Sequence, residues 1–246
     1  MQNIINFHQD FNRFVEDSCR ILPQMQLPIS PLQYVLREKL VNQDGLWLEF
    51  GVGSGHTLNL ICEYRLQGTV YGFDSFEGLP LNWRTEFPKG AFKQPELPQV
   101  KSNATLIKGL FEDTIPQFLA AQCNSYISLL HIDCDLYSST KTIFSYLGEK
   151  LIEGSIIVFD ELIGYPGFES HELKAFYEFA LASKKRFQWI GINGIKETKE
   201  LLEYAQYGSM GECWFPQSVP LKERVAVRVR ANASKYSTRI LRSQER

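Results

Sequence analysis

The sequence predicts a doubly wound α/β domain with a mostly parallel sheet. Short apolar runs of strand length alternate with segments in which apolar residues recur at helical spacing. A Gly-rich turn follows the first of these runs, and several runs end in an acidic residue. Strand–helix alternation indicates a parallel sheet, because two parallel strands need a long crossover between them. The chain of 246 residues can bury a complete core, and we expect residues 1–246 to form a single domain.

We expect seven strands, each a short apolar or β-branched run. They lie at Leu46–Phe50, Thr69–Asp74, Ala104–Lys108, Ile127–Asp133, Ser155–Asp160, Phe187–Ile192 and Arg224–Arg230. In the last run Val225, Val227 and Val229 alternate with polar residues or alanine, which predicts an antiparallel edge strand. Helical patterns fill most of the intervals, for example Ser138–Leu151 and His171–Ser183.

Residues 1–41 are expected to add two helices before the first strand. The first helix is predicted from apolar residues at helical spacing, namely Ile4, Phe7, Phe11, Phe14 and Val15. The second is predicted to begin at Ser30-Pro31, a capping residue followed by proline at the first helical position, and to run to about Val41.

Composition and charge narrow the class of protein. Hydrophobic residues make up 44% of the chain and the formal net charge is -2, which argues against a general nucleic-acid binder. No apolar run approaches the roughly 20 residues that span a bilayer, and no signal-peptide pattern is present. The five cysteines form no C-x-x-C pair, which fits reduced thiols. We therefore expect a cytoplasmic protein with a small-molecule partner, and a homo-oligomer remains open.

The Gly-rich turn is the most specific sign of a ligand. Gly51, Gly53 and Gly55 occupy the first, third and fifth positions, whereas a dinucleotide fingerprint requires its third glycine where His56 stands. The Gly-Lys-Ser/Thr of a P-loop is also missing. The preceding acid, Glu49, suits a ligand with a cationic amine and no phosphate, such as S-adenosylmethionine. We expect Glu49 to orient the methionine end of that cofactor.

Acids end four of the expected parallel strands: Glu49, Asp74, Asp133 and the pair Asp160-Glu161. Ligands of open α/β sheets bind at the carboxyl edge, so these acids should converge on one crevice. Asp74 follows Gly51 by roughly 20 positions, the separation at which an acid can hydrogen-bond the hydroxyls of a ribose. We expect Ser75 beside it, and Thr57 just after the glycines, to contact the same cofactor.

Three of these acids indicate a metal site. Asp133, Asp160 and Glu161 are hard oxygen donors with no clustered His or Cys in sequence, which selects Mg²⁺, Mn²⁺ or Ca²⁺. Carboxylates this close would raise one another's pKa unless a cation lay among them. The D-x-D pattern of Asp133 and Asp135 also occurs in haloacid-dehalogenase-type phosphatases and metal-dependent glycosyltransferases. Neither of those classes explains the Gly-rich turn.

The same strand end offers a general base. His131, Asp133 and Asp135 lie at alternate positions, so the period of a strand puts them on one side. Asp135 is the first candidate for the base that accepts the proton of a hydroxyl, with Asp133 as the second catalytic acid. A helix cap is the alternative interpretation for Asp135, and a buried structural histidine is the alternative for His131.

One long segment, Leu79–Val100, interrupts the strand–helix rhythm. It carries four prolines and three aromatic residues, namely Pro80, Pro88, Pro95, Pro98, Trp83, Phe87 and Phe92. Loops of this length without secondary structure are uncommon and are usually functional or disordered. The aromatic residues favour a folded substrate lid over residues 79–100. At the other end of the chain, the basic segment after Leu221 predicts a strand followed by a solvated tail at 231–246.

Five segments in order resemble the macrocin O-methyltransferase family: Glu49–Thr57, Gly72–Pro80, Gly109–Pro116, Ile132–Thr140 and Gly154–Glu161. The resemblance covers roughly Pro31 to Phe179. It implies a class I, Rossmann-like methyltransferase fold with seven strands, the last antiparallel. It also implies metal ligation by Asp133, Asp160 and Glu161, and an adenine pocket near Gly109 and Phe111. Glu161 departs from the family, whose members often carry Asp or Asn there.

Together these observations predict an S-adenosylmethionine-dependent and divalent-metal-dependent O-methyltransferase. The resemblance implies an acceptor hydroxyl on a sugar or a glycosylated natural product, and thus a role in natural product biosynthesis. Two alternatives remain at this point. One is a metal-dependent glycosyltransferase that uses the D-x-D acids, and the other is a catalytically silent module that binds S-adenosylmethionine.

Overall fold

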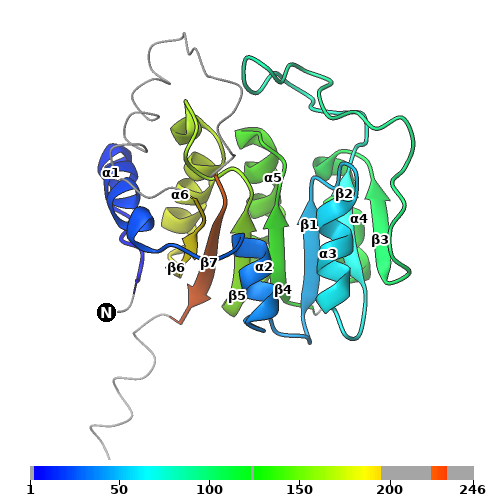
Figure 1. Cartoon of the computed structure of the whole chain (residues 1–246), viewed down its shortest axis with the longest axis horizontal. Helices are drawn as coiled ribbons and strands as arrows, with labels where there is room; N and C mark the ends of the chain where they lie inside the picture. The colour runs from blue at the N-terminus through cyan, green and yellow to red at the C-terminus, as the bar shows by residue number, and fades with distance from the viewer. Residues whose placement is uncertain (1–2, 123–124, 195–222, 232–246) are drawn as a thin grey trace, which may run out of the picture.

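A single seven-stranded sheet organises the protein (Figure 1). The computed structural model describes residues 3–122, 125–194 and 223–231. The strands are β1 Leu46–Phe50, β2 Val70–Asp74, β3 Ala104–Lys108, β4 Ile127–Ile132, β5 Leu151–Phe159, β6 Arg186–Ile192 and β7 Val225–Arg230. Their order across the sheet is β3-β2-β1-β4-β5-β7-β6, and β7 runs opposite to the other six strands. The predicted doubly wound, mostly parallel fold is confirmed.

Helices cover both faces of the sheet (Figure 1). They are α1 Phe11–Ile21, α2 Pro31–Arg37, α3 His56–Tyr64, α4 Phe111–Ala121, α5 Tyr137–Leu147 and α6 Glu172–Ser183, with short 3-10 turns η1 Leu22–Gln24, η2 Gly148–Lys150 and η3 Phe168–Ser170. Within the described residues, no helix is long and apolar enough to cross a membrane. The helix after β4 ends at Leu147 rather than Leu151, where β5 already begins.

Two hydrophobic cores lie on opposite faces of the sheet, because successive strand residues point to opposite sides. Ile157 and Phe159 of β5 pack with α4, α5 and α6, whereas Ile156 and Val158 pack with α2 and α3. All four side chains are fully buried. This two-sided burial explains why the parallel strands are nearly continuous apolar runs in the sequence.

The expectation that the last strand lies at the edge is wrong. β7 lies between β5 and β6 and pairs antiparallel with both, so β6 forms the edge. Ala226, which an edge strand could expose, is fully buried. The alternation of valines with polar residues predicted an edge strand because Arg228 and Arg230 are partly exposed. They lie in the second half of β7, where a central strand can still expose its side chains.

The N-terminal helix is shorter than the apolar spacing predicts. It begins at Phe11, capped by the Asp10 carboxylate, which accepts a hydrogen bond from the backbone N–H of Asn12. Ile4 instead forms an antiparallel bridge with Gln188, so residues before the helix run along the edge strand β6. The second predicted helix also ends early, at Arg37, because Lys39 adopts a left-handed backbone conformation (φ 54°) that cannot continue a helix.

The segment from Leu79 to Val100 forms no helix or strand, although all of it is described. It folds on itself through backbone hydrogen bonds, such as those from Leu79 N–H to Ala91 and from Trp83 N–H to Phe87. The Phe87 ring stacks between Trp83 and Phe92, with ring centroids 5.4 and 4.9 Å away. Aromatic packing therefore orders the loop, as the sequence predicts.

The central position of β7 can be tested by stability. We expect Ala226→Asp to lower the free energy of unfolding by roughly 3–5 kcal/mol, because it leaves an uncompensated charge inside the sheet. Arg228→Asp, on the same face of the same strand, should cost less than half as much because this position is partly exposed. Urea unfolding of both variants measures the difference. Equal losses would contradict the inserted position of β7.

Candidate active site

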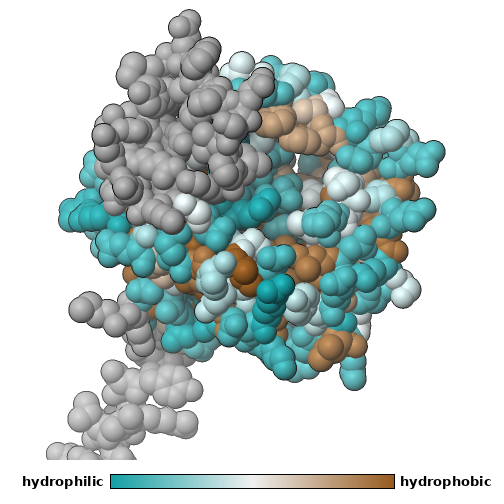
Figure 2. All heavy atoms as spheres, viewed as in Figure 1, coloured by the Kyte–Doolittle hydropathy of each residue, from teal (hydrophilic) through white to brown (hydrophobic). Residues whose placement is uncertain are grey.

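A cavity of about 620 Å³ opens at the carboxyl ends of the central strands. Its walls come from the Gly-rich turn after β1, the segments after β2, β3 and β4, and the loop that was predicted to be a lid. In Figure 2, hydrophobic side chains gather where that loop crosses the top of the molecule. Leu81 and Phe92 of the loop are exposed. The cavity therefore lies at the sheet edge where open α/β folds bind ligands.

Backbone hydrogen bonds continue past the strands and align the site residues. The N–H of Gly51 donates to the backbone carbonyl of Phe73, that of Asp133 to the carbonyl of Phe50, and that of Asp160 to the carbonyl of Ile132, each over 2.9 Å. The Gly109 N–H likewise donates to the backbone carbonyl of Asp74 over 3.0 Å. These bonds place the ends of β3, β2, β1, β4 and β5 in one row, as the sequence predicts.

The three glycines of the turn all have positive φ, of 92°, 49° and 79°. A Cβ on Gly51 would lie 1.7 Å from the carbonyl oxygen of Asp133, so only glycine allows this approach. Gly51 and Gly53 line the cavity together with Thr57. Gly55 does not line it; it caps α3 and faces Pro98.

Asp74 is held rigidly opposite the glycines. Its Oδ2 accepts a hydrogen bond from Gly53 N–H at 2.8 Å, and its Oδ1 accepts one from Phe76 N–H at 2.7 Å. Asp74 lines the cavity together with Ser75, Gly109 and Phe111. The structure therefore brings together every predicted cofactor residue except Gly55 and Glu49.

Glu49 lies beneath the cavity rather than in its wall. It is fully buried inside β1, and its Oε1 lies 2.9 Å from Nδ1 of His131 on β4. Neither residue lines the cavity. The structure therefore does not bring Glu49 to the position expected for the methionine end of a cofactor. His131 is buried and does not face the cavity, so the structure does not place it as a general base.

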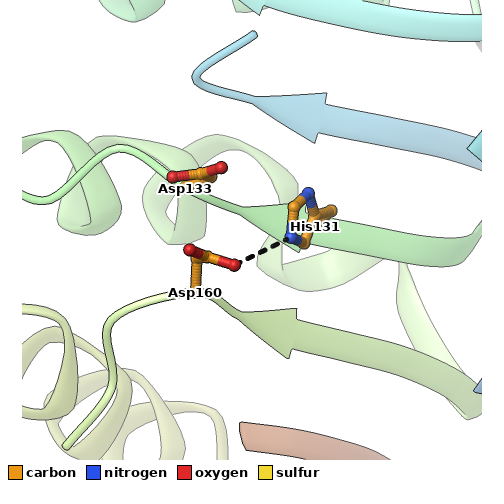
Figure 3. A group of neighbouring side chains, drawn as sticks. All are labelled: His131, Asp133 and Asp160. Carbon is orange, nitrogen blue, oxygen red and sulfur yellow. Dashed lines mark ion pairs between the residues drawn. The ribbon is translucent and has the colours of Figure 1, made fainter. Parts of the chain in front are cut away.

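An acid cluster occupies the ends of β4 and β5. Ligand atoms of His131, Asp133 and Asp160 all lie within 4.8 Å of one another (Figure 3). The imidazole points towards Asp160, with Nε2 4.0 Å from its Oδ1. Desolvation raises the pKa of Asp133 well above its usual range, and the charges of Asp160 and Glu49 raise it further. Burial also raises the pKa of Glu161 well above its usual range, and the charges of Asp160 and Asp133 raise it further.

The structure brings a positively charged side chain, that of Arg224, into this cluster, and its proximity was not apparent from the sequence. Arg224, immediately before β7, contacts both carboxylate oxygens of Asp160, with Nη2 2.9 Å from Oδ2. Burial opposes ionisation of Asp160, but the hydrogen bonds and charge of Arg224, with His131, lower its pKa below the usual value. The interaction spans 64 positions, so no local pattern could have indicated it.

The donor set fits a divalent cation. Among the described residues, the buried Nε2 of His131 and Oε2 of Glu161 have no hydrogen-bond partner. A histidine held by a carboxylate behind it, as Glu49 holds His131, is the usual second layer of a metal site. The grouping differs from the predicted trio, because His131 lies within it and Glu161 lies beside it in the cavity wall.

Asp135 is a buried acid in the cavity wall. It has a left-handed backbone conformation (φ 66°), and burial raises its pKa to about 7 although Arg84 opposes the shift. The helix-cap interpretation is wrong, because α5 has Leu136 at its cap position and no side-chain capping bond. Asp135 is therefore free of the capping role that competed with catalysis.

Arg84 and Glu223 also line the cavity, and sequence reasoning missed both. The Arg84 guanidinium carbon lies 3.8 Å from the ring centroid of Trp83 and 3.7 Å from that of Tyr165. Its Nη1 donates to Glu223 Oε1 at 3.1 Å. A loop residue and a residue 139 positions away thus close one wall, a pairing without a local signal.

The sheet order, the glycine turn and the acid at the end of β2 define the class I methyltransferase fold. Residues 48–162 match the family model described as a methyltransferase domain, which confirms the predicted enzyme class for this part of the chain. The fold resembles CalS11, a calicheamicin methyltransferase, at 20% identity and a TM-score of 0.52, over 90% of this chain and 95% of that one. It also resembles the O-methyltransferase NovP at 15% identity and a TM-score of 0.50, over 91% and 100%. No curated protein matches the chain in sequence.

The role of Asp74 can be measured directly. Asp74→Ala should weaken binding of S-adenosylhomocysteine by about 10–100-fold, the range for removing a charged hydrogen-bond partner. Isothermal titration calorimetry measures the loss, and circular dichroism checks the fold. Asp44→Ala, at an exposed acid before β1, should bind as the parent does. Parent-like affinity in Asp74→Ala would show that this acid does not hold the cofactor.

Proposed function

We propose that the protein is an S-adenosylmethionine-dependent O-methyltransferase that uses a divalent cation. The acceptor is a hydroxyl of a polyhydroxylated small molecule, namely a sugar or a glycosylated natural product. One observation carries the proposal: a single cavity has a glycine turn and Asp74 on one side and Asp133, Asp135 and Glu161 on the other. A cofactor and an acceptor can therefore meet in it.

The cofactor half consists of residues from three strand ends. Asp74 would bind the ribose hydroxyls, with Ser75 and Thr57 as further contacts. The backbone of Gly51 and Gly53 lines the path that a cofactor would follow, and Gly55 would act through the shape of the turn. Gly109 and Phe111 would form the adenine pocket. Glu49 would act from below, through His131, since it does not reach the cavity.

Asp133, Asp160 and Glu161 would hold Mg²⁺, with Mn²⁺ or Ca²⁺ as the other cations that suit oxygen donors. His131 offers one nitrogen donor on the sheet side, oriented by Glu49. Imidazole ligation would weaken the preference for Mg²⁺ and Ca²⁺, because imidazole suits transition metals better. When bound, such a cation lowers the pKa of hydroxyls that it contacts and orients them.

The protein's own residues would supply the remaining chemistry. Asp135 lies in the cavity wall and would accept the proton of the acceptor hydroxyl. The hydroxyl oxygen would bond to the methyl carbon as the carbon–sulfur bond of the cofactor breaks, so that S-adenosylhomocysteine leaves. Trp83, Phe87 and Phe92 would cover the acceptor and exclude water, since all three line the cavity from the lid loop. Positioning of the two reactants in one cavity can contribute roughly 7–11 kcal/mol.

The two alternatives fit less well. A glycosyltransferase would not need the glycine turn or the Asp74 contacts, and the domain match favours methyl transfer. A silent binding module would not need Asp135 in the cavity wall. The resemblance to the macrocin family supports a sugar acceptor and a place in natural product biosynthesis. A cytoplasmic location, the absence of nucleic-acid and membrane partners, and a homo-oligomer remain predictions.

The cation can be tested through Asp160. Asp160→Asn keeps the shape of the side chain and removes a formal charge, so methyl transfer should fall at least 100-fold while S-adenosylhomocysteine binding stays within about 3-fold of the parent. Excess chelator should mimic the substitution in the parent, and Mg²⁺ or Mn²⁺ should reverse it. Glu153→Gln, at an exposed acid of β5, the strand that leads to Asp160, serves as the control. Full methyl transfer by the parent in excess chelator would refute the metal mechanism.

Asp135 can be tested by a variant that removes only its basicity. Asp135→Asn should lower kcat by about 10²–10⁴-fold, the usual contribution of a general base, with a smaller effect on KM. Melting temperature and S-adenosylhomocysteine affinity should remain close to those of the parent. If Asp135→Asn keeps kcat, another group accepts the proton.

A further inference from the structure

The acid cluster brings four carboxyl groups close to one guanidinium. Asp133, Asp135, Asp160 and Glu161 lie around the ends of β4 and β5, and each of the last three is 7% exposed. Arg224 is the guanidinium that contacts them among the described residues, and it does so through Asp160. Burial of several carboxyl groups beside one guanidinium favours either protonation, as the raised pKa of Asp133 and Glu161 shows, or the entry of further positive charge.

Arg224 and a divalent cation would use the same carboxylate. Asp160 contributes a ligand atom to the group formed with His131 and Asp133. Both oxygens of that carboxylate also contact Arg224, through Nε to Oδ1 and Nη2 to Oδ2. Oδ1 is in addition the oxygen that faces His131 Nε2. A cation seated between His131, Asp133 and Asp160 would therefore meet the positive charge of the guanidinium.

We propose that Arg224 is a built-in competitor of the divalent cation: its guanidinium neutralises Asp160 in the metal-free protein and gives up that carboxylate when the cation binds. This rests on the cation site of the proposed function. Arg224 has room to leave, because its side chain is 38% exposed whereas that of Asp160 is 9% exposed. The acid is thus fixed and the arginine is the partner that moves.

The competition has two consequences for the protein. Without the cation, Arg224 prevents Asp160 from remaining buried and unpaired, which stabilises the folded state. With the cation, displacement of Arg224 subtracts from the binding free energy, so the parent binds the ion more weakly than its donor set allows. Arg224 would therefore determine how readily the site exchanges its ion.

The test compares cation affinity in the parent and in Arg224→Gln. Titration calorimetry with Mn²⁺ should show roughly 10–100-fold tighter binding in Arg224→Gln, the range expected for relieving a hydrogen-bonded charge pair. Melting in excess chelator should show the variant to be less stable than the parent, and saturating Mn²⁺ should narrow that gap. Arg224→Lys keeps the charge without the fork of donors and should lie between the two.

Arg228→Gln provides the matched control, because Arg228 has the same charge but lies within β7 opposite Ile156, four residues before Asp160. It should bind Mn²⁺ as the parent does. Equal or weaker affinity in Arg224→Gln would overturn the competition and make Arg224 a residue that orients Asp160. Two results together would separate the two proposals. If Arg224→Gln binds Mn²⁺ more tightly than the parent, and the parent keeps full methyl transfer in chelator, the competition is supported and the metal mechanism is refuted. Absence of Mn²⁺ binding in all variants would overturn the competition.

Discussion

The contact between Gly51 and the carbonyl oxygen of Asp133 is the constraint on which the site depends. A Cβ at Gly51 would lie 1.7 Å from that oxygen, so the ends of β1 and β4 approach as closely as backbones can. This approach joins two units that are 82 positions apart in the sequence. The glycine turn and the acid cluster thereby share one cavity, and its two halves can hold two reactants next to each other.

The two halves of the cavity are organised by different physical means. Backbone geometry defines the side of the glycine turn, where positive φ angles and the hydrogen bonds of Asp74 to Gly53 and Phe76 set the shape. Charge defines the other side, where Asp133 and Glu161 are desolvated next to Asp160. The Asp74 carboxylate of the first half is stabilised by backbone N–H groups, whereas the acids of the second half favour protonation or a nearby positive charge. Arg224, the residue before β7, brings a positive charge to Asp160.

The wall formed by the lid loop is held by side chains and not by a strand or helix. Arg84 contacts the rings of both Trp83 and Tyr165 and pairs with Glu223, so the loop, the segment after β5 and the start of β7 meet at one guanidinium. Glu223 and Arg224 are adjacent, and each binds a partner in a different part of the site. The start of β7 is thus a junction between the acceptor wall and the acid cluster.

The sequence by itself determined the strands, the glycine turn and the row of acids, because these depend on local periodicity and on the shared edge of parallel strands. Only the tertiary structure decided that β7 lies inside the sheet, that Ile4 pairs with β6, and that Glu49 faces His131 instead of the cavity. It also decided which cation faces Asp160. These features are contacts between residues far apart in the chain, such as Arg224 with Asp160 across 64 positions. No local pattern encodes such a partner, since it depends on how the strands pair in three dimensions.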